Sequence, residues 1–127
     1  MTRINCVPPE GLSREHLLAE WKELPRVFNL AAKAYHSGRK VAAPERYTLG
    51  AGHVKFFYQR LGYCLKRFFA LREEMLRRGY KPNYDAPPVT EIRDTEWWQH
   101  WWPDEDALRI NRERILERTK KNELRNT

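Results

Sequence analysis

The first residues of the chain could do chemistry through a backbone group. Thr2 follows the initiator Met1, and a small second residue permits removal of that methionine, which leaves Thr2 with a free α-amine. Such amines titrate near pH ~8, so a useful fraction is neutral and nucleophilic at neutral pH. Many proteins begin with a small residue, so this feature indicates a nucleophile only in combination with others.

A second group of candidate residues lies on one face of the first predicted helix. At about 100° of turn per residue, the side opposite the apolar stripe carries Glu15, His16, Ala19, Lys22, Glu23 and Arg26. A face of this composition is usually solvated, and Glu23 with Arg26 could be an ordinary surface pair. From this helix alone we favour the solvated face, with a catalytic Glu23 as the alternative.

The run LGAGHVKFF contains a GxG motif with a lysine three residues beyond it. It lacks both the full nucleotide-binding spacing and a preceding strand, so it does not predict a phosphate-binding loop. We interpret Gly50 and Gly52 as turn residues. His53 is interpreted as a packed polar group, with a DNA contact as the alternative.

Cys6 and Cys64 are the only cysteines. Two isolated thiols make neither a disulfide framework nor a metal site, so we interpret both as structural and expect a reducing, cytoplasmic setting. His36 and His100 have no companions at metal-ligand spacing. No metal and no other cofactor is predicted.

The elements that must position these residues are helical. Ser13 is a fair N-cap, Gly38 a stop signal, and the helix predicted over 14–37 follows an irregular arm at 1–12. Pro25 is expected to bend this helix. Its core stripe is predicted to contain Leu17, Trp21, Leu24, Phe28, Ala31 and Tyr35.

A second apolar stripe predicts a helix over 55–78, with Gly79 as its end. Its members are Phe57, Leu61, Leu65, Phe68, Leu71 or Arg72, and Met75, and Phe56 is expected in the core beside them. Four prolines predict an irregular segment over 80–103. Three acids open a third helix over 104–121, with Leu108 and Ile115 on its inner side. Together these patterns predict an all-α fold: a single compact domain of three main helices over residues 1–127.

The charge balance favours a polyanionic partner. Lys and Arg number 24 against 17 Asp and Glu, giving a net charge of +7 in a chain of 127 residues that is 41% hydrophobic. Each neutralised phosphate releases counterions, so an excess of this kind suits nucleic acid. A basic balance also suits an anionic membrane surface, but no long apolar run exists and the first residues lack a signal-peptide core.

Several blocks of the sequence resemble one family. MTRIN at 1–5, the pairs His16-Leu17 and Ala19-Glu20, ELPRVF at 23–28 and LGAGHVKFFY at 49–58 are similar to the phage-type pyrimidine-dimer DNA glycosylase/AP lyase family, often called endonuclease V. The first 28 residues match without a gap. The resemblance continues, with a short deletion in the 38–48 loop, to about residue 119.

The resemblance implies a specific chemistry. In that family the α-amine of the residue after the methionine, Thr2 here, attacks C1′ of the damaged nucleotide. The base is displaced, a Schiff base forms, and β-elimination breaks the strand. Glu23 lies at the position of the family's active-site acid, where a carboxylate can stabilise the cationic sugar and shuttle protons. The implied partner is double-stranded DNA carrying UV lesions or abasic sites, bound by a monomer, with no cofactor.

The resemblance also implies DNA contacts. His16 matches a position that lines the active site, and family positions that bind phosphates are matched by Arg3, Lys22 and Arg26. Arg114 and Arg118 match basic family positions, and because they are four residues apart they share a helix face that could hold phosphates. Lys22 replaces an arginine, which keeps the charge but loses the bidentate fork. Glu15 replaces a glutamine and brings a negative charge near the DNA, so that contact is not carried over.

Two departures leave the lesion choice open. EWWQHWWP at 96–103 brings four tryptophans where the family has one or two core aromatics; we expect Trp97 and Trp101 in the core. Trp98 and Trp102 are expected to pack, with base stacking as the alternative. The last 25 residues contain no aromatic residue, whereas the phage enzyme ends in a tyrosine-rich tail.

Two rival functions therefore remain: the same chemistry on a different damaged base, or a non-catalytic basic DNA-binding module. The joint presence of Thr2 and Glu23 argues against the second.

Overall fold

The computed structural model describes residues 4–38, 41–87 and 92–125, the last four of these as backbone only. The all-α prediction is confirmed: these ranges contain no β-strand, and a 3-10 turn, η1 (Pro9–Gly11), precedes four helices. The helices are α1 (Arg14–Ser37), α2 (His53–Phe57), α3 (Leu61–Arg77) and α4 (Glu105–Arg125). In the described part of the chain, no helix is long and apolar enough to cross a membrane.

Helix α1 begins and ends where its capping residues predict. The Ser13 side chain accepts a hydrogen bond from the His16 amide, and Gly38 takes the left-handed conformation with φ 69°. The helix continues through Pro25. Its apolar stripe is buried as predicted except for Tyr35, which lies in the last turn and is 37% exposed, with its ring in T-shaped contact with Trp97.

The predicted continuous helix over 55–78 is wrong, because the chain leaves the helical conformation at Arg60, with φ −126° and ψ 39°. The short α2 lies before this break and α3 after it. The first amides of α3 then have partners outside the helix: Leu61 N donates to Trp97 O over 3.1 Å, and Tyr63 N donates to Gln99 O over 3.3 Å. Contacts with residues 97–99 therefore determine where the helix is interrupted between α2 and α3. The hydrophobic periodicity of the sequence does not show this interruption. The predicted stripe is still buried, with Leu65 only partly so.

Gly62 permits this contact between α3 and residues 97–99. A Cβ atom at this position would meet Gln99 O at 2.8 Å and Trp98 O at 3.0 Å. Only glycine therefore allows the two backbones to approach this closely.

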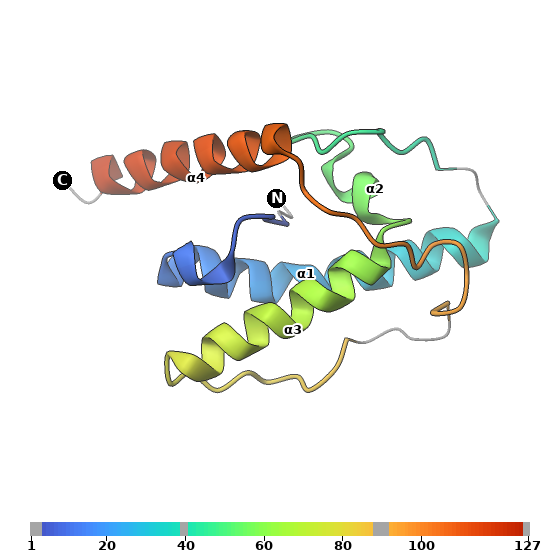
Figure 1. The fold of residues 1–127 in the computed structure, drawn as a ribbon, viewed down its shortest axis with the longest axis horizontal. Coiled ribbons are helices and arrows are strands. Elements are labelled where there is room, and N and C mark those ends of the chain that lie inside the picture. Colours follow the sequence, from blue (N-terminus) through green and yellow to red (C-terminus); the bar gives the residue numbers. More distant parts are fainter. Residues whose placement is uncertain (1–3, 39–40, 88–91, 126–127) are drawn as a thin grey trace.

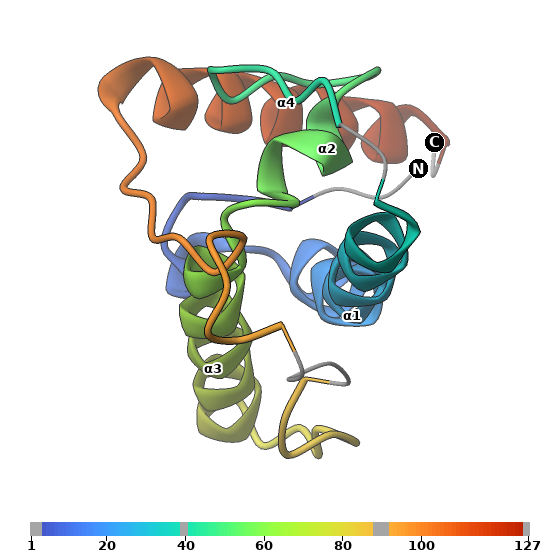
Figure 2. The ribbon, with the colours of Figure 1, turned by 90° about the vertical axis from the view of Figure 1, so that its right-hand side faces the viewer.

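Helix α4 lies apart from the other helices. The predicted start is confirmed by Asp104, whose Oδ1 accepts a hydrogen bond from Ala107 N over 2.8 Å. The helix continues past the predicted end at residue 121 to Arg125, because neither Gly nor Pro interrupts it. Both views of the fold show residues 4–7, which we call the inner arm, between α4 on one side and α1 and α3 on the other (Figures 1 and 2). The inner arm is thus an interior layer of the fold.

The tryptophans of residues 97–102 divide between core and surface. Trp97 is buried, and Trp101 packs among aromatic rings that include Tyr47, Phe56, Phe57 and Tyr63. Trp98 packs on Phe28 with ring centroids 5.9 Å apart. Trp102 is 72% exposed, so the packing expectation is wrong for this residue; its ring lies on the surface near His100 and Lys66.

Candidate active site

The inner arm is buried but pairs with no strand, so side chains satisfy its backbone groups. Ile4 N donates to His53 Nε2 over 2.8 Å, and Ile4 O accepts from the Tyr47 hydroxyl over 3.0 Å. Asn5 O accepts from the Tyr63 hydroxyl over 2.9 Å. These contacts come from the loop before α2, from α2 and from α3. The polypeptide is therefore held at the residues that directly follow Arg3.

A buried polar network joins the inner arm to α1 and α3. Asn5 Nδ2 donates to Glu20 Oε1 over 2.9 Å, and Glu20 receives Arg67 Nε and Nη2 at 2.7 and 2.8 Å. Arg67 Nη1 also donates to Val7 O over 2.6 Å. Every charge in this network has an opposite charge or hydrogen-bond partner, which is the condition for burying charges at tolerable cost.

Four predicted site residues lie on α1. Glu23 follows Glu20 by one turn, about 4.5 Å along the helix axis. Its carboxylate accepts from Arg26 Nη1 over 2.9 Å, with side chains 22% and 60% exposed respectively. Lys22 is exposed and His16 is half-buried, its Nδ1 lying 2.8 Å from Ser13 Oγ. Helix α1 therefore presents a partly exposed carboxylate beside cationic groups, next to the place where it holds the inner arm.

The two predicted residues of α4 lie on the side of that helix that faces the inner arm. Asn111 marks this side, since its side chain is fully buried against the inner arm. Arg114 and Arg118 follow it by three and seven residues, so they share its face. Arg114 Nη1 contacts Glu117 Oε2 at 3.3 Å, and Arg118 is exposed. Among the described residues, the buried Nε of Arg114 has no hydrogen-bond partner.

The predicted Thr2 and Arg3 lie outside the described residues. The described candidates therefore form two groups, one on α1 and one on α4, with the inner arm between them (Figure 2).

A comparison with known proteins identifies the family of this chain. The sequence model of the pyrimidine dimer DNA glycosylase family matches residues 1–88, which is more than half of the 127 residues. The chain belongs to the pyrimidine dimer DNA glycosylase family. Membership implies pyrimidine dimer glycosylase activity in DNA repair, with DNA as the substrate. The matched range contains the inner arm, α1, α2 and α3, and thus the whole Glu20–Arg67 network.

Sequence reasoning missed several residues that build this glycosylase fold around the inner arm. Tyr47, Tyr63, Arg67 and Asn111 look in sequence like core aromatics and surface polar groups. The signal available for Arg67 was a charge at a helix position flanked by buried residues, which requires a partner. The packing prediction for His53 is confirmed, since this residue is 2% exposed and contacts both Ile4 N and Thr48 O.

The cysteines of the glycosylase are structural, as predicted. Both are buried and free. Burial raises the pKa of the Cys6 thiol from its ordinary 9.0 to about 12, and it raises the pKa of Cys64 as well. Thiols with such high pKa values are poor nucleophiles at neutral pH.

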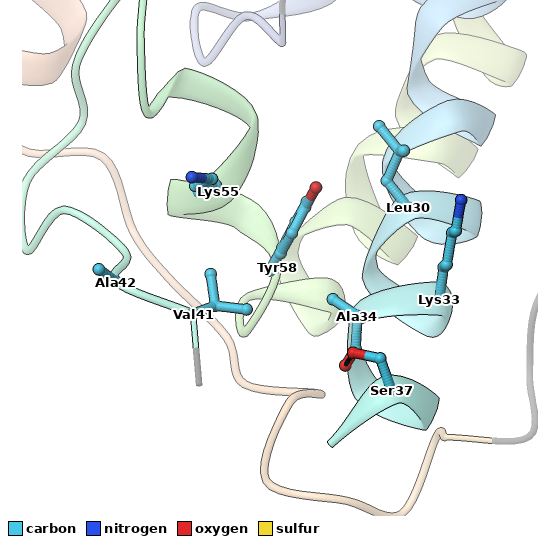
Figure 3. Close-up of a pocket in the computed structure, with 8 residues that line it drawn as sticks. All are labelled: Leu30, Lys33, Ala34, Ser37, Val41, Ala42, Lys55 and Tyr58. Carbon is cyan, nitrogen blue, oxygen red and sulfur yellow. Dashed lines mark hydrogen bonds between the residues drawn. The ribbon is translucent and has the colours of Figure 1, made fainter. Parts of the chain in front are cut away.

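A pocket of about 700 Å³ lies beside the C-terminal half of α1 (Figure 3). Lys33 from α1 and Lys55 from α2 flank it, with the Tyr58 ring between them. Leu30, the first α1 residue of its lining, follows Glu23 by two turns, about 10 Å along the axis. Of the predicted site residues that the structure describes, none lines this pocket.

Proposed function

We propose that this glycosylase excises cyclobutane pyrimidine dimers through the α-amine that Thr2 gains when Met1 is removed, and that it then cleaves the abasic site. The observation that carries the proposal is the attachment of the inner arm to Glu20, one turn before Glu23. Thr2 lies two residues before the anchored Ile4, so chain length alone keeps it within about 7 Å of Ile4. An amine confined in this way reacts faster than an amine that must first diffuse to the substrate.

The proposed reaction has four steps. The amine lone pair attacks C1′ of the deoxyribose, and the bond from C1′ to the base breaks as the base takes the bonding electrons and a proton. The C1′–O4′ bond then opens as the nitrogen lone pair forms the imine and O4′ takes a proton from a general acid, giving a protonated imine and a hydroxyl on C4′. A base removes a proton from C2′, and the 3′ phosphate leaves as the strand breaks. Hydrolysis of the imine regenerates the amine and releases the unsaturated sugar.

We assign the carboxylate role to Glu23. It is partly exposed, so a DNA substrate can contact it, and Arg26 at 2.9 Å orients it. A carboxylate here stabilises the positive charge that develops on the sugar and the imine, and it accepts the C2′ proton. The buried Glu20 is excluded from this role because Arg67 and Asn5 already occupy both of its oxygens.

DNA would be bound from both sides of the inner arm. On α1 the proposed contacts are His16, Lys22 and Arg26, and on α4 they are Arg114 and Arg118, with Arg3 beside the nucleophile. The net charge of +7 supports binding of a polyanion. We further propose that the protein acts as a monomer in the cytoplasm.

Borohydride reduction of the protein with dimer-containing duplex tests the proposal. Protein freed of Met1 should give a covalent protein–DNA adduct, and peptide mapping should find the sugar on the amine of Thr2. Undamaged duplex of the same sequence is the control and should give none. Absence of an adduct from Met-free protein under conditions of base release would refute the Schiff-base mechanism, and an adduct on a lysine would refute the assignment to Thr2.

A further inference from the structure

Helix α4 is attached to the rest of the molecule through the inner arm. The buried residues of its described part are Ala107 and Asn111. Ala107 O accepts from Cys6 Sγ over 3.5 Å, and Asn111 contacts three consecutive residues of the inner arm. The arm therefore lies between α4 and the body of the fold (Figures 1 and 2).

The side-chain amide of Asn111 makes all three of these contacts. Its Oδ1 accepts from Cys6 N over 2.7 Å and from Val7 N over 3.1 Å, and its Nδ2 donates to Asn5 Oδ1 over 2.7 Å. The side chain is 0% exposed, so bulk water does not reach these groups in the native fold. Removing it leaves two buried amide hydrogens without an acceptor, which is costly for the conformation of this segment.

The contacts of Asn111 continue into α1. Asn5 receives the Asn111 amide on its Oδ1 and donates from its Nδ2 to Glu20. Hydrogen bonds thus connect α4 to α1 at the turn before Glu23. Fully satisfied buried networks of this kind rigidify the segments that they join.

We propose that Asn111 is a positioning residue for the N-terminal nucleophile. It holds residues 5–7 of the inner arm, the segment that continues from the nucleophile, and it does so from the helix that also carries Arg114 and Arg118. This inference rests on the proposed function, since it concerns the same amine. Family membership does not assign it, because Asn111 lies beyond the matched residues 1–88.

The test separates positioning from stability by comparing two variants. Asn111→Ala removes the contacts with the inner arm, whereas Leu71→Ala removes a fully buried side chain of α3. For each, the single-turnover rate constant of base release and the Kd for dimer duplex are measured well below the melting temperature. We expect Asn111→Ala to lower the rate constant about tenfold or more, since a misplaced nucleophile reacts slowly. Its Kd should stay within about twofold, because positioning acts on chemistry rather than on binding.

Leu71→Ala should lower the melting temperature and leave the rate constant near the wild-type value. Hydrogen exchange adds a local measurement: the Cys6 and Val7 amides should exchange faster in Asn111→Ala than in Leu71→Ala. If Asn111→Ala does not fold, Asn111→Ser takes its place, because its hydroxyl still offers one acceptor and should give an intermediate rate constant.

Three results would overturn the inference. One is a rate constant for the Asn111 variant equal to that of Leu71→Ala, while wild-type protein is trapped normally; the proposed function then stands and only the positioning role fails. Another is a loss confined to Kd. The third is a wild-type protein that releases bases without any borohydride adduct, which would remove both proposals together.

Discussion

Arg67 and Glu20 form a bidentate ion pair in which no more than 5% of either side chain is exposed. Burial alone would lower the pKa of Arg67, but the charge of Glu20 and the hydrogen bond between them raise it above its ordinary range. Arg67 therefore remains charged across the accessible pH range. The pair also holds the inner arm, through Asn5 on one side and Val7 O on the other.

Breaking this pair from one side should destabilise the fold strongly. Arg67→Met leaves Glu20 as an uncompensated buried charge, so the free energy of unfolding should fall by about 3–5 kcal/mol in urea titrations. Glu20→Leu combined with Arg67→Met should cost less than Arg67→Met alone, because no charge is then stranded. Arg26→Ala, which removes an exposed ion pair, is the control and should cost less than about 1 kcal/mol. A cost for Arg67→Met as small as that of the control would contradict the structural role.

The buried thiols should make the protein less stable at alkaline pH. Because burial raises the pKa of Cys6 from 9.0 to about 12, its contribution to stability is complete below pH 9 and is lost as pH rises from 9 towards 12. Urea titrations between pH 8 and pH 11 should show this decline, and replacing both cysteines with alanine should make it shallower. An unchanged pH slope in the double variant would show that the thiols do not titrate in this way.

Glu23→Gln should separate binding from catalysis. The amide keeps the shape of the side chain but neither accepts a proton nor stabilises a cation, so base release should fall by about 100-fold or more. Affinity for dimer duplex, measured by fluorescence anisotropy, should be retained. Glu73→Gln, an exposed residue of α3, is the matched control and should be fully active. Normal cleavage by Glu23→Gln would show that the acid has been misassigned.

The state of the N-terminus should matter more than the side chain of residue 2. Retention of Met1 displaces the amine by about 3.8 Å, enough to abolish in-line attack and adduct formation. Thr2→Ala still offers an α-amine, so it should keep considerable activity. Mass spectrometry of each preparation reports the fraction that retains Met1, and activity should scale with the Met-free fraction. Full activity in protein that retains Met1 would place the nucleophile elsewhere.

Salt dependence should test the phosphate contacts that we propose for α4. Arg118→Ala should weaken binding of all duplex sequences and reduce the slope of log K against log salt by about one. Arg109 is the control, because it lies two residues before Asn111, on the opposite face of α4, where it pairs with Glu113. Arg109→Ala should leave the slope unchanged. Equal effects of both substitutions would mean that α4 attracts DNA through its overall charge rather than through one face of the helix.

Much of the local structure follows from the order of residues along the chain. Ser13 and Gly38 determine both ends of α1, because capping depends on groups within one turn of the helix end. Gly50 and Gly52 have φ values of 72° and 92°, as their assignment to turns requires. The burial of Phe56 and Phe57 follows from the apolar pattern.

The residues that surround the inner arm required the tertiary structure. Asn111 lies more than 100 positions along the chain from Asn5, and nothing in its own surroundings marks an amide as buried. The break between α2 and α3 has the same origin, since carbonyl groups of residues 97–99 supply its partners.

The sequence by itself determined the helical class, the caps, the core stripes and the family resemblance, because each depends on residues close together or on blocks that recur in relatives. Only the tertiary structure decided that four elements converge on residues 4–7 and that Glu20 is buried whereas Glu23 is partly exposed. The physical reason is that a buried polar group must find its partner in space. Which partner it finds depends on how the helices pack.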